Sequence, residues 1–298
     1  MTEDLAPKTN SLPNSLASAI DVAIEDALAE GRIAGCVVLV AENGKLVYQR
    51  AAGHADRETG RQMQIETPFR FASVTKAFTT MATLKLIEAG RLLPEDKVTK
   101  YLPKFAPRLA DSSIADIRIS HLMTHTAALD YRSQQASDGP YARAGVSDGL
   151  DESRGSLDAN LTRIASVPLD RAPGEGWRYS VATDVLGGVI EAVTGMTPND
   201  AISAPGIGAA TTERGVSLAR RGSCRSLSRR QTGAGANGRR RRVAAALQRG
   251  DGCALRSGSD SRRDRRPSGG AGMAGRSRDV LTLLEAYRTG SFLGRRTP

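Results

Sequence analysis

The chain has 298 residues, enough for one or two domains with a substantial buried core. Its longest apolar runs, such as 36–41, are too short to span a bilayer, and its first residues are acidic rather than basic and then apolar. We therefore expect no membrane partner and a cytoplasmic location. Three cysteines, Cys36, Cys224 and Cys253, show no paired spacing, so neither a disulfide framework nor a zinc site is expected.

The formal net charge of +10 comes from one segment. Residues 202–266 hold sixteen Arg, no Lys and four acidic residues, so the rest of the chain carries a net charge of −2. This composition, without aromatic residues, buries too little apolar surface to offset chain entropy. One interpretation is a basic, disordered tether for nucleic acid, although the aromatic residues that usually accompany such binding are absent. The other, which we favour because the segments on either side keep their separation, is that the coding DNA is read out of frame here. We therefore expect no specific nucleic-acid partner.

In chain order, apolar spacing first predicts a helix over 15–31. Two apolar runs, 36–41 and 45–52, then flank the dipeptide Asn43-Gly44. Asn-Gly favours a tight hairpin turn because both of its positions take a positive φ. A long helix is predicted over 73–90.

Further along the chain the predicted helices are shorter. They lie near 120–122, 159–166 and 182–194, and Gly195 closes the last of them. Residues 130–158 are rich in Gly, Ser and Asp, which indicates a long loop beside an active site. A final helix is predicted near 278–287, where the residues available for burial are Val280, Leu281, Leu284 and Tyr287.

The stretch Ser73-Val74-Thr75-Lys76 opens the long predicted helix. Residues three apart share one helical face, so Lys76 can reach the hydroxyl of Ser73. The ammonium and the positive end of the helix dipole both favour the alkoxide, which makes Ser73 a candidate nucleophile. Taken alone, this short pattern also fits a helix-capping serine followed by a solvated lysine.

Three stretches together resemble the serine β-lactamase and penicillin-binding-protein superfamily in order and spacing, namely 70–76, 121–126 and 173–180. Within it they look most like the class C β-lactamase-like esterases, called family VIII carboxylesterases. The resemblance covers about 15–202 and resumes near Pro267. It implies a β-lactamase/transpeptidase-like fold. Such a fold has an α/β part, in which helices flank an antiparallel sheet, and an inserted all-α domain.

The resemblance also implies a domain organisation. Residues 1–72 would form the N-terminal part of the α/β domain, 73–201 the nucleophile helix and helical domain, and 267–298 a remnant of the C-terminal α/β part. Residues 202–266 would be disordered or out of frame. The family's third motif, on a C-terminal strand, lies beyond the last residue, so we expect the fold to be incomplete there.

For function, the resemblance implies a serine hydrolase that cleaves small-molecule carboxylic esters through an acyl-enzyme on Ser73. Lys76 and Tyr179, hydrogen-bonded to each other, would act together as the base, without cofactor or metal. Val181 stands where the family's tyrosine motif has an asparagine that binds a β-lactam side chain. The absence of this asparagine favours an esterase over a β-lactamase. The alternatives are a β-lactamase or D-Ala-D-Ala peptidase of the same superfamily, or an inactive, truncated homologue. The oligomeric state is left open.

Two other motifs compete for a functional role. Residues 145–149 fit the G-x-S-x-G pattern of the α/β-hydrolases, but neither a buried strand before Ser147 nor a later histidine is present. His121 and His125 are spaced to share a zinc ion, yet the glutamate of H-E-x-x-H is missing. We expect the two histidines to cap and pack the loop beside the active site.

Overall fold

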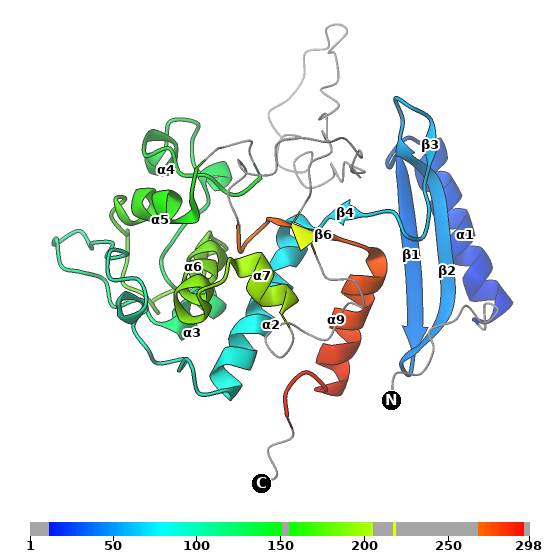
Figure 1. Ribbon diagram of the computed structural model, residues 1–298. Coiled ribbons are helices and arrows are strands. Elements are labelled where there is room, and N and C mark those ends of the chain that lie inside the picture. The colour runs from blue at the N-terminus through cyan, green and yellow to red at the C-terminus, as the bar shows by residue number, and fades with distance from the viewer. Residues whose placement is uncertain (1–11, 151–154, 205–216, 219–267, 295–298) are drawn as a thin grey trace, which may run out of the picture. The chain divides into compact units, whose positions relative to one another are not determined.

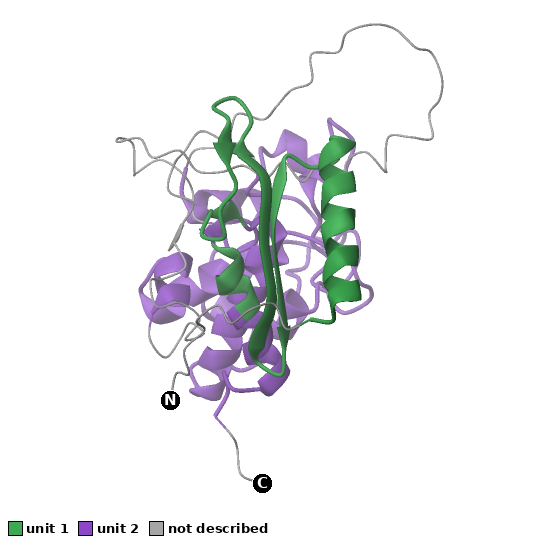
Figure 2. Cartoon of the chain, turned by 90° about the vertical axis from the view of Figure 1, so that its right-hand side faces the viewer, with its two compact units in different colours: residues 1–70, 221–258, 276–281 green, residues 71–220, 259–275, 282–298 purple. Residues whose placement is uncertain are grey.

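The computed structural model describes residues 12–150, 155–204, 217–218 and 268–294. They fall into two compact units, which Figure 2 shows in different colours and which are described separately below. The first unit contains residues 1–70 and 276–281, together with 221–258, which lie outside the described residues. The second unit contains residues 71–220, 259–275 and 282–298.

The first unit is built on a three-stranded antiparallel sheet in the order β1-β2-β3. Its elements are α1 (Asn14–Ala29), β1 (Gly35–Glu42), β2 (Lys45–Asp56), β3 (Arg61–Gln62) and β4 (Phe69–Arg70). The register of the hairpin runs from Gly35 opposite Gly53 to Glu42 opposite Lys45. Because the turn residues Asn43 and Gly44 have φ values of 51° and 78°, the predicted hairpin turn is confirmed.

Helix α1 lies along this hairpin (Figure 1). The hydroxyl of Tyr48, on β2, donates a hydrogen bond of 2.5 Å to the Asp21 carboxylate of the helix. Arg50, two residues further on, forms ion pairs with Asp21 and Glu25 of the same helix. The helix predicted at 15–31 therefore exists, and polar side chains attach it to the second strand.

The second unit is mainly helical, with a short β5–β6 pair. Its elements are α2 (Thr75–Glu88), α3 (Ile119–Met123), α4 (Pro140–Arg143), α5 (Leu157–Ala165), α6 (Ala182–Thr194), α7 (Pro198–Ser203), β5 (Ser217–Leu218) and β6 (Met273–Gly275). Helix α9 (Ser277–Thr289) begins in the first unit and ends in the second. The helices predicted near 120–122, 159–166 and 182–194 are thus present as α3, α5 and α6.

Helix α6 is the centre of the second unit, and α2, α3, α5 and α7 all pack against it (Figure 1). Its first nine residues, Ala182–Ile190, are all buried. Two glycines allow this crowding: a Cβ at Gly188 would lie 2.6 Å from the Leu161 side chain of α5, and one at Gly187 would lie 3.2 Å from Gly269. Gly195 ends the helix in a left-handed conformation, as expected.

Some expectations change in detail. The helix predicted from residue 73 starts as a 3-10 turn over Ala72–Val74, and α2 begins at Thr75. The loop predicted over 130–158 contains a 3-10 turn and the short helix α4. In α9 the buried residue is Leu283, whereas Leu284, expected to be available for burial, is 57% exposed because the next residue of a helix lies about 100° further around its axis.

The arginine-rich segment 202–266 lies mostly outside the described residues. Ile202 and Ser203 complete α7, and Ser217–Leu218 pair with β6. Within the parts of the chain that the structure describes, no helix has the length and apolar character needed to cross a membrane.

Candidate active site

Ser73 is presented at the surface by a tight turn at the start of α2. The residue before it, Ala72, has a φ of 44°, a conformation that costs energy for a residue with a side chain. The turn is held on one side by Phe71, whose N–H donates to the Met273 carbonyl at 2.9 Å and whose ring stacks on Phe78 of α2. An exposed serine that directly follows a strained residue, in a turn held by its neighbours, is typical of a functional position.

Lys76 is one turn further along, and its Nζ contacts three oxygen atoms. It lies 3.4 Å from the Oγ of Ser73, 3.0 Å from the hydroxyl of Tyr131 and 2.9 Å from the carbonyl of Gly270. An ammonium has three N–H donors, so these oxygens match its full donor capacity. The predicted pair Ser73 and Lys76 is thus brought together.

Tyr179 reaches the same lysine through its ring face. The Nζ of Lys76 lies 4.8 Å from the centroid of the Tyr179 ring, a cation–π contact. The ring stacks on Tyr131, with centroids 5.3 Å apart and planes 5° apart, and also contacts His125. Among the described residues, the Tyr179 hydroxyl has no hydrogen-bond partner, so the bond to Lys76 that the resemblance implied for this tyrosine is made by Tyr131 instead.

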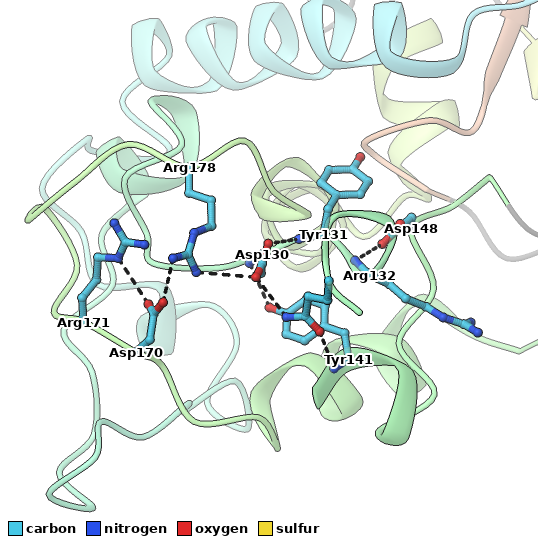
Figure 3. A network of polar contacts seen from close by, with 9 residues as sticks. Asp130, Tyr131, Arg132, Tyr141, Asp148, Asp170, Arg171 and Arg178 are labelled. Atoms are coloured by element: carbon cyan, nitrogen blue, oxygen red, sulfur yellow. Dashed lines mark hydrogen bonds and ion pairs between the residues drawn. The ribbon is translucent and has the colours of Figure 1, made fainter. Parts of the chain in front are cut away.

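Tyr131 is held by a polar network that reaches the Tyr179 segment (Figure 3). Its N–H donates to the Asp130 carboxylate at 2.7 Å, and Asp130 pairs with Arg178 at 3.5 Å. Arg178 directly precedes Tyr179 and also binds Asp170 at 2.6 Å. The ion pair therefore connects the two segments that carry the stacked tyrosines.

The protonation of Tyr131 follows from its surroundings. Burial, followed by the negative charge of Asp184, raises the pKa of Tyr131 well above its usual value. Tyr131 therefore stays a neutral phenol at physiological pH and can accept an N–H of Lys76 without serving as a phenolate base.

Sequence reasoning missed two of the three oxygens around Lys76. Tyr131 is 55 residues from Lys76 in sequence, and Gly270 is 194 residues away. Tyr131 lies in the predicted loop 130–158, which marked the region without singling out a residue. A main-chain carbonyl such as that of Gly270 leaves no signal in side-chain chemistry.

The two histidines have separate partners rather than a shared site. The Nδ1 of His121 accepts the N–H of Arg118 at 3.3 Å and caps α3. The Nδ1 of His125 accepts the N–H of Ser180 at 3.2 Å, and its ring packs on Tyr179. The described residues contain no group of three or more His, Cys, Asp or Glu side chains placed to hold a metal ion.

Ser147, the serine of the G-x-S-x-G motif, is a buried structural residue. It is 1% exposed, and its main chain exchanges two hydrogen bonds with the Asn160 side chain, at 3.0 and 3.1 Å. Helix α4, rather than a strand, precedes it. A nucleophile elbow needs an exposed serine between a strand and a helix, so this motif is not one.

Val181, at the position of the family's asparagine, is fully buried at the N-terminus of α6. Its N–H donates to the Asp130 carbonyl at 3.2 Å, and its apolar side chain packs inside the unit. This position therefore offers no side-chain donor to a ligand.

Comparisons with known proteins show which family and fold the chain resembles. The model of the beta-lactamase family matches residues 20–297. Esterase EstB of Burkholderia gladioli is 41% identical over 286 residues, which cover 92% of this chain and 70% of the relative. The solved structure of EstCE1, a hydrolase with promiscuous acyltransferase activity, is 36% identical with a TM-score of 0.72, covering 93% of this chain and 73% of that one. A D-amino acid amidase from Ochrobactrum anthropi SV3 shares the fold, with a TM-score of 0.63 at 17% identity over 95% of this chain and 74% of that one.

Proposed function

Because the chain belongs to the beta-lactamase family, we propose that it is a serine carboxylesterase that hydrolyses small carboxylic esters through an acyl-enzyme on Ser73. The observation that carries this is the placement of the Lys76 Nζ against the Ser73 Oγ on one side and against Tyr131 and Gly270 on the other. No cofactor or metal takes part in this reaction.

The hydrogen-bond capacities of these groups define the base. The Gly270 carbonyl can only accept, so even a neutral Lys76 keeps one N–H directed to it. A second N–H binds the Tyr131 hydroxyl, which leaves the lone pair of the amine for the proton of Ser73. When the Ser73 Oγ attacks the ester carbonyl carbon, that proton moves to Lys76, and all three N–H groups of the resulting ammonium have acceptors.

Tyr179 completes the transfer. Its ring face stabilises the ammonium of Lys76, and its hydroxyl, without a partner among the described residues, is available to the substrate. We assign to it the donation of its own proton to the leaving oxygen as the carbonyl–oxygen bond to the alcohol breaks, which leaves Tyr179 as a phenolate. Water then attacks the acyl carbon and gives a proton to this phenolate. As the bond to the Ser73 Oγ breaks, Ser73 takes back the proton held by Lys76, and the carboxylic acid leaves.

The oxyanion of the tetrahedral intermediate would be stabilised by main-chain N–H groups. The family resemblance supports the N–H of Ser73 as one donor and an N–H of a sheet strand as the second. A chain that acylates but turns over slowly would indicate that this second donor is weak or missing.

A trapping experiment tests the assignment. The chain is incubated with a p-nitrophenyl ester or a fluorophosphonate, quenched in acid and digested, and the modified peptide is identified by mass spectrometry. We expect the mass increase on the peptide that contains Ser73. An adduct on the Ser147 peptide, or none on a folded chain, would reject this function.

A further inference from the structure

Asp184, on α6, is a buried carboxylate that the proposed reaction does not use directly. It is 1% exposed, and its Oδ1 accepts a hydrogen bond of 2.6 Å from the Ser268 hydroxyl and one of 3.4 Å from the N–H of Gly270. Asp184 lies in the first turn of the helix, where the positive end of the helix dipole favours a negative charge. A buried charge is costly, and its presence here calls for a reason.

The turn that Asp184 holds is packed between two helices. The Ser268 hydroxyl also accepts the N–H of Ala271 at 2.9 Å, which closes the turn on itself. From α2, the Thr79 hydroxyl donates to the Gly269 carbonyl at 2.7 Å. From α6, the Thr183 carbonyl would lie 2.5 Å from any Cβ at Gly269. The turn is therefore fixed from both sides.

Gly270 is the point where this turn meets the lysine. Its N–H faces Asp184 while its carbonyl accepts an N–H of Lys76 at 2.9 Å. A Cβ at Gly270 would lie 2.6 Å from the Asp184 Oδ2 and 3.5 Å from the Lys76 Nζ, so carboxylate and ammonium approach the same small space. One peptide group thus stands between a buried negative charge and the base.

We propose that Asp184 is a positioning residue of the site: it holds the 268–270 turn so that the Gly270 carbonyl orients Lys76. The catalytic role of Asp184 rests on the proposed function, whereas the contact between the turn and Lys76 does not depend on it. The other titratable groups near Lys76 are Tyr131, Tyr179 and His125, with Asp148 beside Tyr131. Burial and the lysine charge lower the pKa of His125, so it contributes no positive charge at neutral pH.

The expected effect follows from the acceptor that Asp184 provides. Replacing Asp184 by Ala removes the acceptor for the Ser268 hydroxyl and for the N–H of Gly270, so the turn loosens and the Gly270 carbonyl is no longer fixed beside Lys76. Replacing Asp184 by Asn keeps the volume and the Oδ1 acceptor, so this variant should keep the carbonyl in place.

The decisive experiment combines kcat for a p-nitrophenyl ester with NMR at constant pH of the full chain labelled with 13C at the lysine ε-carbons, where the Lys76 signal is assigned by its loss in Lys76→Arg. In Asp184→Ala we expect the Lys76 signal to move and kcat to fall by about tenfold or more, the effect of losing one positioned hydrogen bond to a charged group. Asp184→Asn should restore most of both, which a loss of packing alone would not explain. Asp148→Ala is the matched control, since Asp148 is a carboxylate 7% exposed that binds the N–H groups of Arg132 and Ser133 rather than the turn.

The outcomes separate the two proposals. An unchanged Lys76 signal and kcat in Asp184→Ala, in a chain whose circular dichroism is that of the wild type, would overturn the role of Asp184 even if esters are hydrolysed. Failure of Asp184→Asn to restore them, or an equal change in Asp148→Ala, would overturn it as well. A Lys76 signal that moves in Asp184→Ala and returns in Asp184→Asn, in a chain that never acylates Ser73, would support the contact and reject the esterase function.

Discussion

Lys76 is the residue on which the chemistry depends, because its three oxygen contacts come from different parts of the chain. Tyr131 supplies one of them at 3.0 Å, and its hydroxyl stays protonated. We expect Tyr131→Phe to reduce kcat for a p-nitrophenyl ester by about one to two orders of magnitude, because it removes one hydrogen bond to the lysine and such bonds to charged groups contribute about 1.5–3 kcal/mol. The melting temperature should change little, because the ring and its stacking on Tyr179 remain.

Tyr179→Phe is the informative comparison. It keeps the cation–π contact with Lys76 and removes only the hydroxyl that we assign to the leaving group. Its loss of kcat should therefore be smaller for substrates whose leaving alcohol needs no proton, such as p-nitrophenol, than for alkyl esters. Equal losses for both kinds of ester would contradict this role.

His125 makes stability depend on pH. Burial, followed by the charge of Lys76, lowers the pKa of His125 in the folded chain below the value of about 6.5 for an unfolded one. Between those two values the unfolded chain binds more protons, so this contribution to stability is complete above about pH 6.5 and is lost as the pH falls. Thermal melting of the wild type from pH 8 to 5 should show the decline.

The variant His125→Asn isolates this effect. Asparagine tolerates the φ of 57° at this position, and its oxygen can accept the N–H of Ser180 in place of Nδ1. We expect a similar melting temperature at pH 8 and a shallower decline below pH 6.5. An identical decline in both proteins would assign the acid sensitivity to other groups.

At the scale of elements, α5 anchors the loop that carries Ser147. Asn160 is 1% exposed and satisfies both the N–H and the carbonyl of Ser147. Replacing it by Ala would leave two buried main-chain groups unpaired, so we expect a loss of about 2–3 kcal/mol in the free energy of unfolding, measured with urea. Thr162→Ala, on the exposed side of the same helix, should cost less than about 0.5 kcal/mol.

Elements defined by local signals were predictable, and contacts between distant segments were not. Asn43-Gly44 fixes the hairpin through two positive φ angles, and the end of α6 follows from Gly195. Ser73 and Lys76 were found because one helical turn relates them. Tyr131 and Gly270 reach the same lysine only through the folding of the second unit, which no local pattern encodes.

The alternative functions differ by what Val181 can do. A β-lactam side chain is bound in the resembling family by an asparagine, and the valine here is buried and has no donor. Losing one such hydrogen bond costs about 1–3 kcal/mol, or roughly five- to two-hundred-fold in rate. We expect turnover of a p-nitrophenyl ester to exceed that of a chromogenic cephalosporin by a wide margin, and comparable rates would favour a β-lactamase.

For the whole molecule, the unusual segment is 202–266, with its sixteen arginines. The family model matches residues 20–297, a range that includes this segment. Such a match is consistent with a frameshift, which replaces residues without changing the spacing between the flanking motifs. We predict that the coding DNA, read in the other frames from the codon of Ile202, encodes a sequence that continues the family pattern. If those frames encode only arginine-rich or interrupted products, the segment is instead a genuine basic tether. Salt-dependent binding of the chain to DNA would then be expected.

The identity of the nucleophile is the central claim, and a pair of serine variants tests it most directly. Initial rates of p-nitrophenyl ester hydrolysis are measured for the wild type, Ser73→Ala and Ser147→Ala, each checked for folding by circular dichroism. Since Ser73 is exposed beside Lys76 and Ser147 is buried, we expect Ser73→Ala to lose nearly all turnover and Ser147→Ala to keep most of it. Full turnover in Ser73→Ala, with loss in a folded Ser147→Ala, would contradict the mechanism.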